Sequence, residues 1–186
     1  MNCAISCWGL RCCERLTQGA MTMVRYRRST IPGSTLFFTT NLRNRRSDLL
    51  TRHIGALRQA VTDVQRVQPF IINAWVVLPE HMHCIWTLPP DDSDFSQRWR
   101  ALKRHFTQAL RMRNIWQPRF WEHTLRDEMD YRRHVVDYCY FNPVKHGWVA
   151  SVQEWPYSSF HRDVRRGLYS ADWGGNIGEV DAGERR

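Results

Sequence analysis

Two strongly apolar runs separated by one short turn constrain the fold of this 186-residue chain more than any other feature. Residues 70–78, FIINAWVVL, are almost all apolar, and residues 81–88, HMHCIWTL, follow directly after Pro79 and Glu80. Short runs rich in β-branched and aromatic residues favour strands, and so short a turn joins antiparallel neighbours. The sequence therefore predicts a β-hairpin whose first strand is a central strand covered on both faces.

Helical and strand patterns on both sides extend this hairpin into an α+β domain. We expect a strand over residues 34–42, a helix that Ser47 caps and that runs to about Arg66, a helix over 91–112, a strand over 115–125 and a helix over 127–141. The first six elements give the order β-α-β-β-α-β, which is the split βαβ pattern of the ferredoxin-like fold. That fold has an antiparallel sheet with helices on one face, and the helix over 127–141 is additional to it.

The two ends of the chain differ from its centre. Four of the six cysteines fall within the first thirteen residues, and the absence of any CxxC pair argues against a zinc ribbon or a spread disulfide framework. Met21 or Met23 is a candidate natural start. We expect a disordered or non-native leader over residues 1–22, one catalytic domain over 23–167 and a Gly-rich acidic tail over 168–186.

The charge of the chain indicates the kind of partner. The sequence has 27 Lys+Arg against 18 Asp+Glu, a net charge of +9, together with nine Trp. A folded, basic and aromatic-rich chain favours a polyanionic partner, with nucleic acid as the first candidate. The basic residues that we expect to contact phosphates are Arg43, Arg45 and Arg46 in one turn and Arg98, Lys103 and Arg104 on one helix.

Two short patterns carry the candidate chemistry. His81 and His83 point to the same face of their strand, because side chains alternate along a strand, and two such imidazoles can close on one metal ion. An HxH pattern alone is weak, since it also occurs at an ordinary polar strand end. On the last helix, residues four apart share one face, and these are His134, Tyr138 and Asn142.

Taken together, the two patterns and the segments around them resemble a known protein family. The segment LPEHMHCIWTLP, followed about fifty residues later by DYCYFNPVKHG, resembles the REP-associated tyrosine transposases. These are domesticated relatives of the single-tyrosine HUH transposases of bacterial insertion sequences. The likeness runs from about Arg25 to about Trp173 and includes IWQPRFWEH and NPVKHGWV. It implies a ferredoxin-like fold with a further C-terminal helix that carries the nucleophile.

The resemblance also implies roles for individual residues. His81 and His83 would bind a divalent metal, Mg²⁺ or Mn²⁺, and Tyr138 would be the nucleophile. Asn142 falls where the insertion-sequence relatives carry a Gln that completes the metal site, so it is the expected third ligand. Lys145 and His146 follow directly and are expected DNA contacts. Tyr140 lies two residues from Tyr138 and is expected to face away.

The implied activity is cleavage and rejoining of single-stranded DNA beside a REP hairpin, through a covalent 5′-phosphotyrosine. Two alternatives stay open at this point: a module that binds REP hairpins without cutting, and a hydrolase that uses a metal-bound water while Tyr138 is merely structural. The implied partner is hairpin DNA, with the protein a monomer or a homodimer. No run approaches the ~18 apolar residues of a membrane span, and we expect a cytoplasmic, nucleoid-associated protein.

Overall fold

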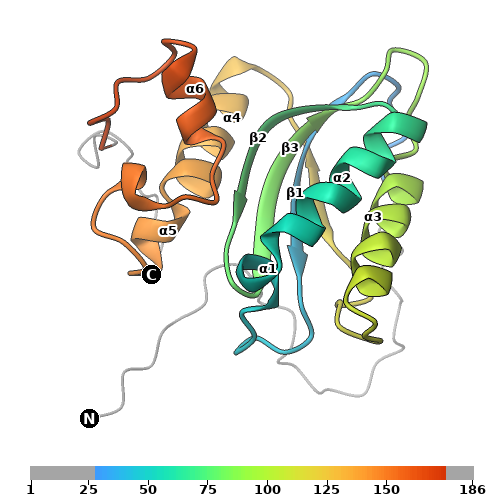
Figure 1. Cartoon of the computed structure of the whole chain (residues 1–186). Coiled ribbons are helices and arrows are strands. Elements are labelled where there is room, and N and C mark those ends of the chain that lie inside the picture. Colours follow the sequence, from blue (N-terminus) through green and yellow to red (C-terminus); the bar gives the residue numbers. More distant parts are fainter. Residues whose placement is uncertain (1–27, 175–186) are drawn as a thin grey trace, which may run out of the picture.

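The computed structural model describes residues 28–174 and centres on one four-stranded sheet (Figure 1). Its strands are β1 (Thr35–Asn41), β2 (Ile71–Val77), β3 (His81–Thr87) and β4 (Trp121–Thr124). The strand order is β2-β3-β1-β4, and every neighbouring pair is antiparallel. This topology confirms the ferredoxin-like expectation, and β2 and β3 form the predicted hairpin. The expected leader, residues 1–22, lies outside the described residues.

One face of the sheet is covered by helices from the first half of the chain. They are α1 (Leu49–Arg52), α2 (Ile54–Val67) and α3 (Phe95–Ala109). Trp86 of β3 stacks on Trp99 of α3 with ring centroids 4.4 Å apart, and Phe38 of β1 packs against both. The expected single helix from Ser47 to Arg66 is interrupted at His53, whose backbone (φ −113°, ψ 36°) leaves the helical region.

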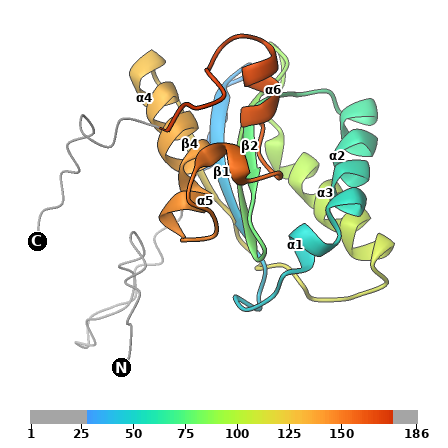
Figure 2. The same cartoon turned by 60° about the vertical axis from the view of Figure 1, so that its left-hand side comes forward.

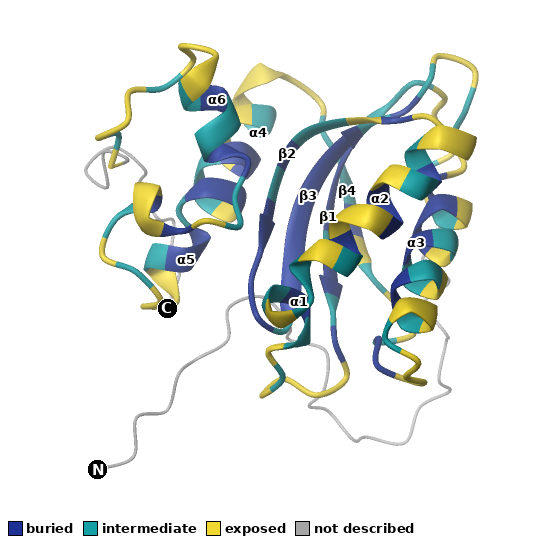
Figure 3. Cartoon of the chain, in the orientation of Figure 1, coloured by how far each residue is buried: buried dark blue, intermediate teal, exposed yellow. Residues whose placement is uncertain are grey.

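The other face is covered by short helices from the C-terminal part (Figure 2). They are α4 (Glu128–Arg133), the π-helix η1 (His134–Tyr140), α5 (Asn142–Lys145), the 3₁₀ turn η2 (Val152–Glu154) and α6 (Phe160–Arg165). Burial is concentrated in the sheet and on the inward sides of both helical layers (Figure 3). The sheet is therefore the middle layer of three.

The prediction of one continuous α-helix over 127–141 was wrong, because its second half is the π-helix η1. Phe141 N–H donates to the Val136 carbonyl 2.9 Å away, five residues back instead of four. Pro143 provides a physical reason, because it has no N–H and its ring would clash with the Cys139 carbonyl in a regular α-helix. Asn142 consequently begins a new helical turn, α5, and does not end the preceding helix.

The position of β2 in the sheet also differs from expectation. It is an edge strand, not a central one. Its outer edge is covered by the chain before α6: Val77 N–H donates to the Tyr157 carbonyl, and Ser159 N–H donates to the Trp75 carbonyl, each at 2.9 Å. This cover satisfies backbone groups that an open edge would expose to solvent. The strand is apolar because both of its faces are covered: Val77 lies in the core beneath α2 and α3, and Ala74 and Val76 lie in the core of the C-terminal layer.

Two further boundaries move. The strand expected over 115–125 is limited to β4, and Trp116 contributes only an isolated bridge to Leu42. Past Gly167, Tyr169 and Trp173 pack against the buried core of the C-terminal layer, so the folded domain extends beyond the expected boundary. In the part of the chain from 28 to 174, no helix is long and apolar enough to cross a membrane.

Candidate active site

His81 and His83 lie at the start of β3 and face the C-terminal helical layer together with Ile85. Both are buried, with exposed fractions of 4% and 7%. Their ring centroids are 5.0 Å apart, and the ring planes are nearly perpendicular at 82°. Perpendicular rings at this distance can aim one nitrogen each at a common point, as two ligands of a single metal ion require.

Both imidazoles are oriented through Nδ1. His81 Nδ1 lies 2.8 Å from Glu80 Oε1, and His83 Nδ1 lies 2.8 Å from Thr39 Oγ1. Within residues 28–174, Nε2 of either ring makes no hydrogen bond, so both atoms are available as ligands. Partners of this kind fix the tautomer of metal-binding histidines. Burial, followed by the charges of His81 and His146, holds the pKa of His83 well below its usual value.

Asn142 supplies a third candidate ligand. Its side chain is 6% exposed, and its Oδ1 is buried without a hydrogen-bond partner among the described residues. A buried carboxamide oxygen left unpaired is costly and is rare in native structures, so it points to a ligand that completes it. His81, His83 and Asn142 therefore fit a divalent cation by their chemistry.

Tyr138 lies on η1 and faces the same histidines. Its ring centroid is 6.0 Å from that of His83, and its side chain is 42% exposed. Lys145 Nζ sits 5.8 Å from the centre of the ring. Tyr140, in contrast, is fully buried and donates a hydrogen bond to Asp163. The tyrosine that faces the histidines and remains open to solvent is thus Tyr138.

Three of the expected DNA contacts surround this pair of histidines. His146 packs 5.3 Å from the His81 ring, and Lys145 neighbours Tyr138. Arg45 lies 3.5 Å from Glu80, the residue that orients His81. Burial alone would raise the pKa of Glu80, but the hydrogen bond and charge of His81, with the charge of Arg45, bring it below its usual value. Two cationic side chains, Arg45 and Lys145, therefore lie next to residues of the candidate site, one beside Glu80 and the other beside Tyr138.

The remaining expected contacts are divided between two regions. Arg43 and Arg46 are exposed beside Arg45, and Arg43 Nε donates to the Trp116 carbonyl. Lys103 and Arg104 lie on α3, across the sheet from the histidines. The expectation for Arg98 needs correction, because it is 2% exposed and its guanidinium is bonded to Pro69, Asp92 and Asp94. Arg98 joins α3 to neighbouring loops and presents nothing to a phosphate.

Sequence reasoning missed a cluster beside Tyr138. His123, Asp130 and His134 offer ligand atoms that all lie within 4.8 Å of one another, and they could also hold a metal ion. The spacing of four between Asp130 and His134 was a visible signal, since residues at that spacing meet on a helix. His123 lies on β4, and no local pattern connects it with the other two.

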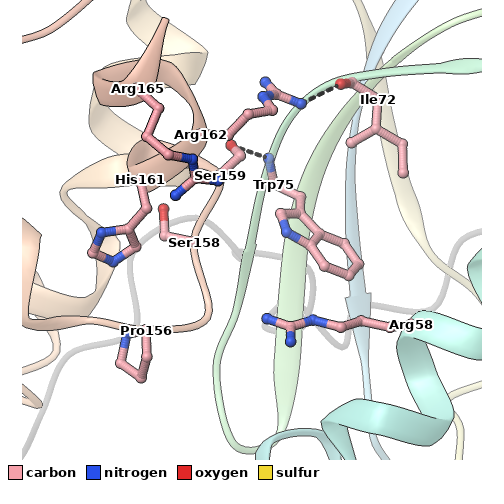
Figure 4. A pocket seen from close by; sticks show the side chains of 9 residues that line it. All are labelled: Arg58, Ile72, Trp75, Pro156, Ser158, Ser159, His161, Arg162 and Arg165. Carbon is pink, nitrogen blue, oxygen red and sulfur yellow. Dashed lines mark hydrogen bonds between the residues drawn. The ribbon is translucent and has the colours of Figure 1, made fainter.

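Two of the pockets on the surface differ in their lining and in their relation to the candidate site. A pocket of about 470 Å³ lies between α2, β2 and α6 and contains Arg58, Trp75 and Arg165 (Figure 4). It includes none of the residues that we expect in the active site. A second pocket, of about 300 Å³, shares Arg45 and Glu80 with the histidine site and is also lined by Trp148. The smaller pocket is therefore the one next to the candidate chemistry.

Comparison with solved structures agrees with this architecture. The structure of a REP-associated tyrosine transposase bound to a REP hairpin matches with a TM-score of 0.81 and 63% identity, covering 88% of this chain and 99% of that one. Fold and site together define a tyrosine transposase. No protein-family model matches the chain.

Comparison with curated proteins narrows the class. The REP-associated tyrosine transposase of Escherichia coli (strain K12) is 63% identical over 163 residues, which are 88% of this chain and 98% of the relative. A relative from Haemophilus influenzae is 42% identical over 168 residues, 83% of this chain and 95% of its own length. The chain belongs to the family of REP-associated tyrosine transposases, for which DNA binding and transposition are the family functions.

Proposed function

We propose that this protein cleaves and rejoins single-stranded DNA beside a REP-type hairpin, with Tyr138 as the nucleophile. The observation that carries the proposal is the contact between the histidine pair of β3 and a tyrosine of η1, two elements far apart in the sequence. The exposed ring of Tyr138 lies 6.0 Å from the buried ring of His83. His146, on the turn that follows the unpaired Asn142, lies 5.3 Å from His81. The relative solved with a REP hairpin supports this substrate class.

The step is an in-line displacement at phosphorus. Tyr138 Oη attacks the scissile phosphate, the bond from phosphorus to the 3′ oxygen breaks, and the phenolic proton is balanced by a proton taken up at that oxygen. The products are a 5′-phosphotyrosine and a free 3′-OH. Because one phosphodiester replaces another, attack by a second 3′-OH reverses the step and joins strands without a nucleotide cofactor.

His81, His83 and Asn142 would hold the divalent metal, Mg²⁺ or Mn²⁺. When bound there, the ion would polarise the phosphate and neutralise charge that develops on its oxygens. Two imidazoles shift the preference towards Mn²⁺ or another first-row metal, because Mg²⁺ favours oxygen ligands. Arg45, Lys145 and His146 would bind the phosphates on either side of the scissile bond.

The test uses a REP-hairpin oligonucleotide with single-stranded flanks, labelled on the 3′ side of the expected cut and incubated with Mn²⁺. The wild-type protein should become covalently attached to the label on a denaturing gel. Tyr138→Phe should abolish the adduct, whereas Tyr140→Phe, the matched control on the same helix, should retain it because Tyr140 faces the core.

Other outcomes identify the alternatives. DNA cutting that survives in Tyr138→Phe would contradict the tyrosine mechanism and favour a hydrolase that uses water. Tight hairpin binding with no cutting under Mg²⁺ or Mn²⁺ would favour a recognition module. Loss of the adduct in Tyr140→Phe alone would show that the two tyrosines have been assigned the wrong way round.

A further inference from the structure

We propose that His134 is a positioning residue for Tyr138, and that Asp130 and His123 fix the plane of its imidazole. The inference rests on the proposed function, because it assumes that the orientation of Tyr138 matters for a reaction. Four aromatic rings, those of Trp121, His123, His134 and Tyr138, form a stacked column in which neighbouring rings are nearly parallel. Trp121 stacks on His123 at 10°, His123 on His134 at 19°, and His134 on Tyr138 at 22°.

Tyr138 depends on ring contacts for its orientation. In the described part of the chain its hydroxyl makes no hydrogen bond, and two-fifths of the side chain is exposed. Its ring touches Phe37 at 5.3 Å and 56°, and His83 at 6.0 Å and 64°. Only the contact with His134, at 5.3 Å, is close to parallel. The plane of the His134 ring is therefore the flat surface against which the tyrosine lies.

His134 itself is rigidly held. Its Nδ1 lies 2.8 Å from the Asp130 carbonyl oxygen and 3.1 Å from Asp130 Oδ1. A carbonyl oxygen only accepts, so Nδ1 carries the hydrogen. Asp130 Oδ2 accepts from His123 Nε2 at 2.9 Å and from the Arg126 N–H at 3.2 Å. One carboxylate thus orients two imidazoles of the column.

The charges of this group are consistent with a packing role. Partial burial works to raise the pKa of Asp130, but the hydrogen bonds from His123 and Arg126 hold it below its usual value, so the carboxylate stays ionised. Burial is the main reason that the pKa of His134 is lowered, which keeps its imidazole neutral at pH 7. A neutral ring acts on Tyr138 through contact and shape.

The same three residues form a poorer metal site than His81 and His83. The nitrogens nearest to the carboxylate are hydrogen-bond donors to it, and each would have to lose its proton before it could bind a metal. The rings of His123 and His134 are also nearly parallel, whereas those of His81 and His83 are nearly perpendicular. Because these two rings are stacked, their in-plane lone pairs lie in separate planes, which suits a single ion less well than the perpendicular pair.

The first measurement needs no activity. Tyrosine ring carbons labelled with ¹³C are observed by NMR, and the Tyr138 signals are assigned from their loss in Tyr138→Phe. His134→Ala should shift these signals because the ring current of the imidazole is gone, and His134→Phe should restore much of the shift difference. His161→Ala is the control, since the His161 ring is also bonded to a main-chain carbonyl but is on α6 and only partly buried. Unchanged Tyr138 signals in His134→Ala would overturn the proposal.

The second measurement follows the covalent adduct in a single turnover at saturating protein. His134→Ala should slow adduct formation by on the order of 10²-fold, the loss expected when a reacting atom is misplaced by about 1 Å. The Kd for the same DNA should not change, and His134→Phe should recover most of the rate. Recovery of the His134→Ala rate by excess Mn²⁺ or Zn²⁺ would show a metal site instead. If the wild type forms no adduct, the proposed function fails, while the NMR result still decides the position of Tyr138.

Discussion

The two faces of the sheet are built from the same strands but differ in chemistry. On the side of α2 and α3, β1 and β3 present Phe38, Met82, Cys84 and Trp86 to a dry aromatic core. On the other side, the alternate residues Phe37, His81, His83 and Ile85 face the C-terminal helices. The period of two along a strand places a structural face and a chemical face on one hairpin.

The two faces also differ in how open their polar groups are to solvent. On the α3 side, Arg98 is buried with its guanidinium bonded to backbone carbonyls and to Asp92. On the other side, the Tyr138 ring is 42% exposed beside the buried ring of His83. Among the described residues, buried polar atoms without a partner occur on both sides, for example Trp99 Nε1 and Asn142 Oδ1, so the exposed tyrosine beside the histidines is what distinguishes the chemical face. Four predictions test this division, beginning with the largest effect.

Removal of a histidine should eliminate the chemistry without unfolding the protein. His83→Ala should lower the rate of adduct formation by at least about 10³-fold, because it would remove a proposed ligand of the metal that we propose stabilises the phosphate in the transition state. Thermal unfolding of the variant shows whether the fold persists. Activity close to that of the wild type at any Mn²⁺ concentration would place the chemistry elsewhere.

Truncation of a core side chain on the structural face should instead lower the stability of the fold. Trp99→Ala removes a buried indole that stacks on Trp86, and it should lower the free energy of unfolding by about 3–5 kcal/mol. Trp121→Ala on the other face is the matched control and should cost less, about 1 kcal/mol, since Trp121 is half-exposed. Urea denaturation measures both, and equal losses would erase the distinction between the faces.

An arginine near the histidine site should contribute more to DNA affinity than an arginine on the α3 side of the sheet. Arg45→Ala should weaken hairpin binding and reduce the slope of log K against log salt by about 1, as expected for one lost phosphate contact. Arg104→Ala, an exposed residue across the sheet, should leave the slope unchanged. Anisotropy titrations over a series of salt concentrations give both slopes. A larger effect of Arg104→Ala would show that DNA also wraps the α3 side.

The smallest effect concerns Lys103, where burial lowers the pKa of the amine to about 8. Below pH 8 the folded protein holds a charged, partly buried ammonium group, which costs free energy. In the unfolded chain the same group is charged and fully solvated. Between pH 8 and 10 the unfolded state binds more protons, so the wild type gains stability as pH rises. Lys103→Met should therefore be more stable than the wild type at pH 7, by about 1 kcal/mol after loss of the bond to Gln117. Urea denaturation should show this advantage shrinking towards pH 10, and a constant difference would contradict the shifted pKa.

The larger elements were predictable because each has a local signal. The hairpin, the helix with Trp99 and the order of the first six elements follow from periodicity and from Pro79–Glu80. The shared face of His81 and His83 follows from strand alternation. The π-helix was not predictable in this way, because Pro143 signals that the regular α-helix is interrupted but does not specify that the preceding turn becomes η1. The edge position of β2 was missed because the strand is buried on both faces, as a central strand would be, and its outer edge is closed by the backbone of residues 157–159.

The sequence by itself determined the α+β order, the histidine pair, the difference between Tyr138 and Tyr140 and the resemblance to a family. These depend on spacing within one element or on long matching segments. Only the tertiary structure decided that Arg98 is internal, that Asn142 Oδ1 is unpaired and that His123, Asp130 and His134 meet behind Tyr138. Those properties arise from contacts between residues on different elements, where burial and hydrogen bonding are set by packing that local sequence does not encode.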